Sequence, residues 1–164
     1  MNNSTVLITG ALSGIGRATA IAFGRAGARV VVSGRRQEQG LAMEAELRKL
    51  GAEAEFIYAD VRQEDEVRSM VDQTVQRFGR LDVAVNNAGT EGKKGPITEQ
   101  SPESYAATFD TNVLGVLLSL KHKLRVMSAQ KSGSIINISS TFGRIGAPRC
   151  LALCCQQACG RRTH

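Results

Sequence analysis

A glycine-rich segment near the start of the chain has the residue types and spacing of a phosphate-binding loop. Residues 9–16 have the sequence TGALSGIG and lie between an apolar run and a helical pattern. Gly10 permits a tight turn, Gly14 lets the backbone approach a pyrophosphate, and Gly16 lets the following helix pack closely. Exposed N–H groups and the helix dipole favour an anion at such a turn. A tight turn without a ligand is the alternative. In this strand–turn–helix context we predict nucleotide binding, with Ser13 and Ile15 as further loop residues of the site.

Two arginines follow the next apolar run and indicate which nucleotide is preferred. Dinucleotide-binding proteins place an acid there that hydrogen-bonds the ribose 2′-hydroxyl. This chain has Gly34 at that position, followed by Arg35 and Arg36. Two guanidinium groups without a carboxylate suit a 2′-phosphate. The alternative is that both arginines only begin an exposed helix. We predict NADP(H) over NAD(H), mainly because the acid is missing.

The remaining pattern predicts the elements that position these residues. Short runs rich in Val and Ile alternate with longer segments of helical periodicity. Most of the runs are apolar on both faces, as expected for a parallel sheet covered by helices on each side. We predict an α/β, Rossmann-like doubly wound parallel sheet of about five strands in the order 3-2-1-4-5. The predicted strands are 5–9, 28–33, 54–58, 81–85 and 133–139, and the predicted helices are 15–26, 36–50, 64–78 and 102–129.

Length and composition exclude several classes of protein. The chain has 164 residues, of which 42% are hydrophobic and 22% charged, as expected for one soluble domain. No apolar run is long enough to span a membrane, and the polar, uncharged start predicts no secretory leader. We therefore expect a cytoplasmic protein. Three of the 21 basic residues and none of the 15 acidic residues follow Pro148, so residues 1–148 carry a net charge of +3. This ordinary charge predicts no nucleic-acid partner.

Several segments together resemble the short-chain dehydrogenase/reductase (SDR) family. The spacing Gly-x-x-x-Gly-x-Gly at 10–16 resembles that of the family, and so does the segment Asn-Asn-Ala-Gly at 86–89, after the fourth predicted strand. The resemblance covers residues 4–148. It implies that two residues after the third strand contact the adenine, that the segment after the fourth strand lines the cofactor site, and that an asparagine and a serine belong to the catalytic site. The adenine contacts would be Asp60 and Val61. The segment that lines the cofactor site would be Asn87, Ala88 and Gly89, and the catalytic residues would be Asn112 and Ser140.

The proton-transfer pair of the family is missing. Its members reduce carbonyls or oxidise alcohols with NAD(P)(H), assisted by a Tyr-x-x-x-Lys pair in which the ammonium lowers the pKa of the phenol. Counted from Ser140, Leu153 stands at the tyrosine position and Gln157 at the lysine position. The only tyrosines, Tyr58 and Tyr105, lie in other segments. We therefore expect an oxidoreductase of an alcohol/carbonyl pair that is catalytically crippled. The alternatives are a vestigial dinucleotide-binding module and a non-functional truncated product.

The last sixteen residues, 149–164, differ in composition from the rest. All four cysteines lie there as Cys-x-x-x-Cys-Cys-x-x-x-Cys, a spacing that matches neither a disulfide framework nor a common zinc site, so we predict no metal. One extra nucleotide near the codon for Pro148 would explain this tail. Back-translation followed by removal of one base places a tyrosine codon at position 153 and a lysine codon at position 157. We interpret 1–148 as an incomplete dinucleotide-binding domain and 149–164 as an aberrant, frame-shifted tail.

The resemblance also has consequences for partners. Members of the family act on small alcohols or ketones, form homo-oligomers and continue with two more strands. Without those strands we expect an exposed sheet edge at the fifth strand and abnormal association through an uncovered helix face. That face is expected to carry Leu114, Val116, Leu117, Leu118 and Leu120. We expect His122 on the helix surface and Lys93 with Lys94 in a solvated loop.

Overall fold

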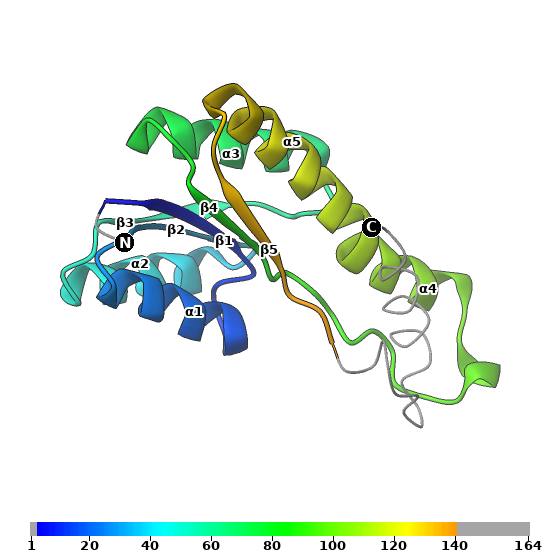
Figure 1. Cartoon of the computed structure of the whole chain (residues 1–164). Coiled ribbons are helices and arrows are strands. Elements are labelled where there is room, and N and C mark those ends of the chain that lie inside the picture. Colours follow the sequence, from blue (N-terminus) through cyan, green and yellow to red (C-terminus); the bar gives the residue numbers. More distant parts are fainter. Residues whose placement is uncertain (1–2, 141–164) are drawn as a thin grey trace.

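A five-stranded parallel sheet forms the centre of the molecule (Figure 1). The computed structural model describes residues 3–140. The strands are β1 (Thr5–Thr9), β2 (Arg29–Gly34), β3 (Ala54–Tyr58), β4 (Val83–Asn86) and β5 (Ser134–Asn137). All neighbouring strands pair in parallel, in the order β3-β2-β1-β4-β5. The predicted fold class and strand order are confirmed.

Helices cover both faces of this sheet. They are α1 (Gly14–Arg25), α2 (Gln37–Lys49), α3 (Glu64–Phe78), α4 (Pro102–Phe109) and α5 (Gly115–Gln130), with a short 3-10 turn η1 (Ile97–Glu99) before α4 and a π-helical turn η2 (Asp110–Leu114) before α5. Helices α1 and α2 lie on one face, and α3 and α5 lie on the other (Figure 1). The chain crosses over between successive parallel strands from β1 to β5, so the carboxyl ends of all five strands lie at the same edge.

The period-2 alternation of the strands divides the core into two layers. Val6 and Ile8 of β1 pack with residues of α1 and α2, whereas Leu7 packs with residues of α3 and α5. Every residue of β1 is buried. This is why the central strands are apolar on both faces: neither face meets water.

The long predicted helix over 102–129 is divided in the structure, which corrects that prediction. The segment Asp110–Leu114 is π-helical and separates α4 from α5. Two contacts accompany the change. The side chain of Asn112 hydrogen-bonds the backbone of Thr90, and Gly115 lies so close to Val61 that a Cβ at Gly115 would be 2.7 Å from Val61 Cγ2. A π turn lets one extra residue enter the helix, and such turns are frequent at functional sites.

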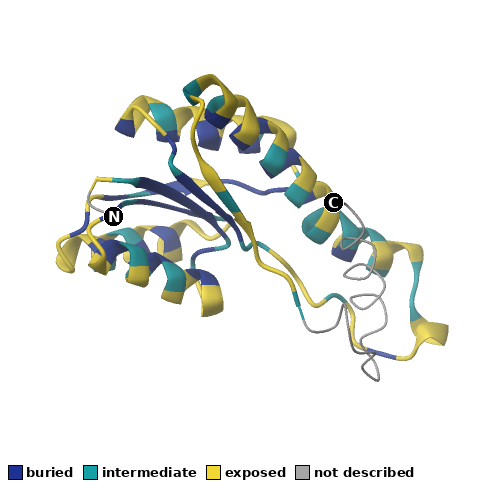
Figure 2. Ribbon diagram, viewed as in Figure 1, coloured by how far each residue is buried: buried dark blue, intermediate teal, exposed yellow. Residues whose placement is uncertain are grey.

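The predicted apolar face of α5 is only partly uncovered. Leu117 is 60% exposed, and Leu114 lies on the exposed side as well. Leu118 is only 7% exposed, because it packs into the core beneath α5, so its prediction was wrong. Strand β5 has exposed residues at most positions and pairs only with β4 among the described residues (Figure 2). An edge strand next to an apolar helix face is therefore present at this side of the sheet.

Candidate functional site

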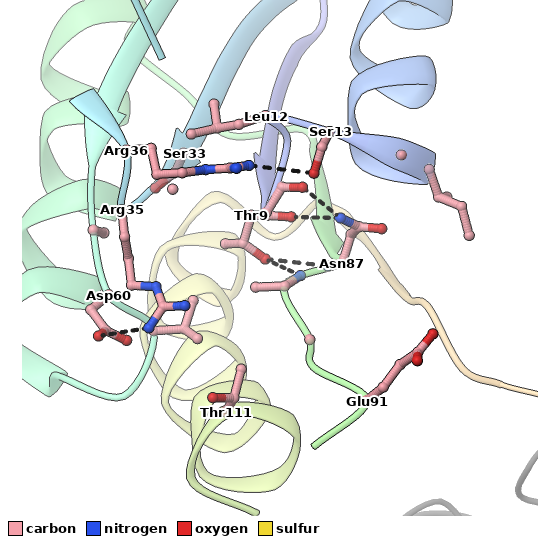
Figure 3. A pocket seen from close by; sticks show the side chains of 18 residues that line it. Thr9, Leu12, Ser13, Ser33, Arg35, Arg36, Asp60, Asn87, Glu91 and Thr111 are labelled. Carbon is pink, nitrogen blue, oxygen red and sulfur yellow. Dashed lines mark hydrogen bonds and ion pairs between the residues drawn. The ribbon is translucent and has the colours of Figure 1, made fainter. Parts of the chain in front are cut away.

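A cavity of about 570 Å³ opens at the carboxyl ends of β1, β2 and β4 (Figure 3). Its volume is in the range of small-molecule and cofactor sites. Most of the predicted cofactor residues line it, namely Gly10, Ser13, Gly14, Ile15, Arg35, Arg36, Asp60, Val61, Asn87, Ala88 and Gly89. Gly16, Asn112 and Ser140 are not among its lining residues. The lining also includes residues that the sequence analysis did not select, namely Thr9, Leu12, Ser33, Gly34, Ala59, Glu91 and Thr111.

The three glycines of the loop occupy three different environments. Gly10 has a φ of +65° and lies so close to the loop after β4 that a Cβ would be 2.7 Å from Ala88 Cα. A Cβ on Gly16 would overlap the Asn87 side chain and the Gly10 carbonyl. Gly14 has a φ of +53°, and a Cβ there would meet nothing within 4 Å. The backbone at Gly14 therefore faces open cavity, as a loop that cradles a pyrophosphate requires.

The N-terminus of α1 carries no internal cap. Its N-cap residue, Ser13, makes no side-chain hydrogen bond to the helix backbone, and the first turn contains no acidic residue. The Ser13 hydroxyl instead accepts a hydrogen bond of 3.5 Å from Arg36 Nη2 (Figure 3). The first N–H groups of a helix need acceptors, and the helix dipole makes this end attractive to anions. The residues present thus fit a phosphate group at this position.

Asn87 holds the glycine loop against β4. Its Nδ2 donates to the carbonyl oxygens of Thr9 at 3.1 Å and of Gly10 at 2.9 Å. In return, Thr9 Oγ1 accepts from the backbone N–H groups of Asn87 at 3.2 Å and Ala88 at 3.3 Å. These contacts fix the loop before any ligand binds. The sequence analysis missed Thr9, although a threonine directly before the first loop glycine was a visible signal.

Leu12 packs against the end of β2, at the position where dinucleotide-binding proteins place an acid. A Cβ on Gly34 would be 2.7 Å from Leu12 Cδ1, so any side chain would require Leu12 to move. The next two residues point in different directions (Figure 3). Arg36 extends toward Ser13, and Arg35 extends toward Asp60, whose Oδ2 lies 3.7 Å from Arg35 Nη1. The rim of the cavity here is cationic.

Asp60 is bound much more tightly by Arg62, a residue that the sequence analysis did not select. Arg62 Nε lies 3.0 Å from each Asp60 carboxylate oxygen, and Arg62 Nη2 lies 2.6 Å from Oδ2. These hydrogen bonds hold the pKa of the Asp60 carboxyl below its usual value, and they raise the pKa of Arg62. Asp60 is therefore ionised, and the positive charge of Arg62 balances its negative charge.

Asn112 and Ser140, the two residues predicted to belong to the catalytic site, are not part of the cavity lining. Asn112 is in the π-helical turn, where its Oδ1 accepts from the backbone N–H of Thr90 at 2.8 Å and its Nδ2 donates to the Thr90 carbonyl at 2.8 Å. This pairing ties the turn to the loop after β4. Ser140 is half-buried and lies three residues beyond the end of β5. Leu153 and Gln157 lie outside the described residues.

Two consecutive residues of α5 are buried on different sides of the helix. His122 is 6% exposed and lies 3.1 Å from Glu64 Oε1 of α3, so the prediction of a surface histidine was wrong. Lys123 is fully buried and donates from Nζ to Asn86 Oδ1 at 2.5 Å. Asn86 Nδ2 in turn donates to Asn137 Oδ1 of β5 at 2.8 Å. Burial lowers the pKa of Lys123 to about 7.

Lys93 and Lys94 are exposed loop residues, as predicted.

Residues 3–140 contain neither a metal-binding cluster nor a membrane-spanning helix. No group of three or more His, Cys, Asp and Glu side chains there is placed to hold a metal ion, and the four cysteines lie outside this range. No helix in the described part of the chain has the length and apolar character needed to cross a membrane.

Known proteins are similar to this chain in sequence and in fold. The family model for short chain dehydrogenases matches residues 4–155. An uncharacterized oxidoreductase of Thermotoga maritima is 42% identical over 144 residues, which cover 88% of this chain and 56% of that protein. The chain spans just over half the length of the curated relatives that it matches.

Two solved structures carry different cofactors on the same fold. Actinorhodin polyketide ketoreductase with NADPH is 34% identical with a TM-score of 0.91, and the match covers 96% of this chain and 62% of that one. Xylitol dehydrogenase with bound NAD⁺ is 32% identical with a TM-score of 0.92, and the match covers 96% of this chain and 60% of that one. Similar structures thus include both an NADPH and an NAD⁺ complex.

Proposed function

Because this chain belongs to the short-chain dehydrogenase family, we propose that its cavity binds NADP(H) in preference to NAD(H). The observation that carries the preference is the rim at the end of β2. Arg35 and Arg36 line the cavity there, and Leu12 fills the space that a side chain at position 34 would need. A cationic rim without a carboxylate at the end of β2 favours a ribose 2′-phosphate over a 2′-hydroxyl.

Different residues of the site bind different parts of this ligand. The backbone at Gly14 and the uncapped start of α1 bind the pyrophosphate, and Arg35 and Arg36 bind the 2′-phosphate. Asp60 and Val61 contact the adenine, as the family resemblance implies. The segment after β4, which comprises Asn87, Ala88 and Gly89, lines the part of the cavity next to the loop. A bound cofactor of this kind supplies or accepts a hydride.

Binding is tested by calorimetric titration of the full chain with NADPH and with NADH. We expect tighter binding of NADPH. Arg35→Gln is expected to weaken NADPH binding about tenfold and to leave NADH binding nearly unchanged, because only NADPH offers a 2′-phosphate to the guanidinium. Arg25→Gln, an exposed arginine outside the cavity lining, is the matched control. Absence of heat with both dinucleotides would overturn the proposal.

We further propose that this chain comes from an oxidoreductase of a small alcohol/carbonyl pair but turns over little or no substrate itself. Ser140 is the residue to orient the substrate oxygen, and Asn112 is the second residue assigned to the catalytic site. A proton donor is missing, because Leu153 and Gln157 stand where the family places its Tyr-x-x-x-Lys pair. The two tyrosines present, Tyr58 and Tyr105, do not line the cavity.

Turnover is tested with a panel of ketones and alcohols. Loss of a positioned general acid costs on the order of 10²–10⁴ in rate, so we expect rates lower by that factor than those of the matched gene from which one base is removed at the codon for Arg149. That gene encodes tyrosine at position 153 and lysine at position 157 when the codons are those inferred above. Equal, ordinary rates for both chains would refute the loss of catalysis.

A dinucleotide-binding module without redox activity is the second candidate. Its support is the combination of a formed phosphate loop and a missing acid–base pair. In that case the chain binds NADPH and 2′-phospho-ADP-ribose alike but does not respond to substrate. We also propose that the protein is cytoplasmic and that family-type homo-oligomers are compromised by the exposed β5 edge.

A further inference from the structure

Asp60 lies between two arginines that hold it unequally. On one side, Arg62 embraces the carboxylate through Nε and Nη2, and its backbone N–H donates to Asp60 Oδ1 at 3.1 Å. On the other side, the nearest contact to Arg35 is 3.7 Å, which is an ion pair but not a hydrogen bond. Arg62 therefore occupies most of the acceptor capacity of Asp60.

Asp60 is also fixed in place. Its backbone N–H donates to Glu66 Oε2 of α3 at 2.7 Å, and its side chain is only 11% exposed. Arg35, by contrast, has a side chain that is 58% exposed, at the cavity rim. Arg35 is thus the more exposed of the two arginines that face Asp60. If Asp60 lost Arg62, Arg35 would need to move only about 1 Å to form a direct hydrogen bond with Asp60.

From this arrangement we propose that Arg62, which does not line the cavity, is a specificity-determining residue that keeps Arg35 available for the 2′-phosphate of NADP(H). The inference rests on the NADP(H) binding proposed above. With Arg62 present, Asp60 and the two arginines carry a net charge of +1. Without it the net charge is zero, and Arg35 is drawn onto Asp60 and away from the 2′-phosphate.

Arg62 acts here as a positioning residue, through Asp60. A purely structural role is the competing explanation, since the same contacts close the turn between β3 and α3. The two explanations differ in what they predict for discrimination. If Arg62 only stabilises the turn, its loss weakens the binding of both dinucleotides equally. If Arg62 acts through the charge of Asp60, its loss changes the ratio of the two affinities.

The test is the ratio of NADPH to NADH affinity, measured by calorimetry on the full chain, for Arg62→Gln. We expect the ratio to fall about tenfold, mainly through weaker NADPH binding. Arg62→Lys keeps the charge but loses the fork, and we expect an intermediate ratio. Arg68→Gln removes the same charge from an exposed ion pair on α3 with Asp65, and we expect it to leave the ratio unchanged.

A rescue variant separates the two explanations. In Arg62→Gln combined with Asp60→Asn, no carboxylate remains to capture Arg35, so the preference for NADPH is expected to return even though both dinucleotides bind more weakly. A ratio in Arg62→Gln equal to that in Arg68→Gln, or no recovery in the double variant, overturns the inference. If the unaltered chain binds neither dinucleotide, the proposed function itself fails, and the inference fails with it. That outcome differs from retained binding with an unchanged ratio.

Discussion

The two sides of the sheet differ in how completely they are enclosed. At the side formed by β1, β2 and α1, every residue of β1 is buried and the glycine loop is held by Asn87. At the side formed by β5 and α5, the strand is exposed at most positions and Leu117 faces solvent. Figure 2 shows the contrast between the dark central strands and the exposed outer one.

This difference separates the residues proposed to bind the cofactor from those proposed to act in catalysis. The cavity proposed to bind the nucleotide is lined by the carboxyl ends of β1, β2 and β4 and by the loops that follow them. In the proposed function, catalysis depends on Ser140, which follows the exposed strand, and on a proton donor at positions where this sequence has Leu153 and Gln157. The proposed function therefore separates cofactor binding from catalysis in this chain.

Lys123 of α5 contacts Asn86 of β4 and so connects the two sides. Its full burial gives the largest expected effect on the free energy of unfolding. The folded protein favours its neutral amine down to about pH 7, whereas the unfolded chain binds this proton up to about pH 10. Between these values the unfolded state holds more protons, so the free energy of unfolding rises with pH. The contribution is on the order of 4 kcal/mol over the interval.

Urea unfolding from pH 7 to pH 10 measures this dependence. Lys123→Met is expected to remove the rise, since the methionine stem fills the same space without a proton to lose. Lys121→Met is the matched control, because Lys121 lies two residues away but pairs with Glu64 at the surface. Equal pH dependence in both variants would show that Lys123 is not the titrating group.

Gly16→Ala tests the enclosed side. The added methyl would overlap the Asn87 side chain and the Gly10 carbonyl, so we expect a loss of about 2–3 kcal/mol in the free energy of unfolding, together with loss of nucleotide binding. Gly14→Ala meets no atom and suffers only the cost of its left-handed backbone, about 1 kcal/mol. The comparison fails if the two variants are equally stable.

Leu117→Gln combined with Leu124→Gln tests the open side, and its effect on folding is the smallest. Both leucines are exposed on α5, so the free energy of unfolding is expected to change by less than about 0.5 kcal/mol. Self-association, measured by sedimentation velocity, is expected to decrease because an apolar patch is removed. Leu41→Gln, an exposed leucine of α2, is the control. A wild-type chain that is monomeric at all concentrations would contradict the expected association.

The fold was predictable where local pattern decides it. Strands 5–9 and 54–58 have the predicted bounds, because their apolar residues alternate between two covered faces. The fourth strand begins two residues later than predicted. The reason is distant in sequence, since the Gln130 side chain binds both the N–H and the carbonyl of Leu81. The π-helical turn likewise depends on a contact between Asn112 and Thr90.

The candidate site was predictable to the extent that its residues act through backbone and sequence spacing. The glycine loop and the two arginines meet that condition. Arg62 and Lys123 do not, because their roles come from a carboxylate across a turn and from an amide on a neighbouring strand. The burial of His122 was not predictable for the same reason. Helix α5 contacts α3 on one side and β4 on another, so its helical periodicity does not mark a single buried stripe.

The clamp between Asn87 and the glycine loop has a consequence for how fast and how tightly a nucleotide is captured. A loop whose Thr9 and Gly10 carbonyls already accept hydrogen bonds from Asn87 loses little conformational entropy when an anion arrives. Capture is then governed by the release of water from the phosphate and from the arginines rather than by rearrangement of the chain, so we expect association rates that fall with ionic strength and show no slow phase.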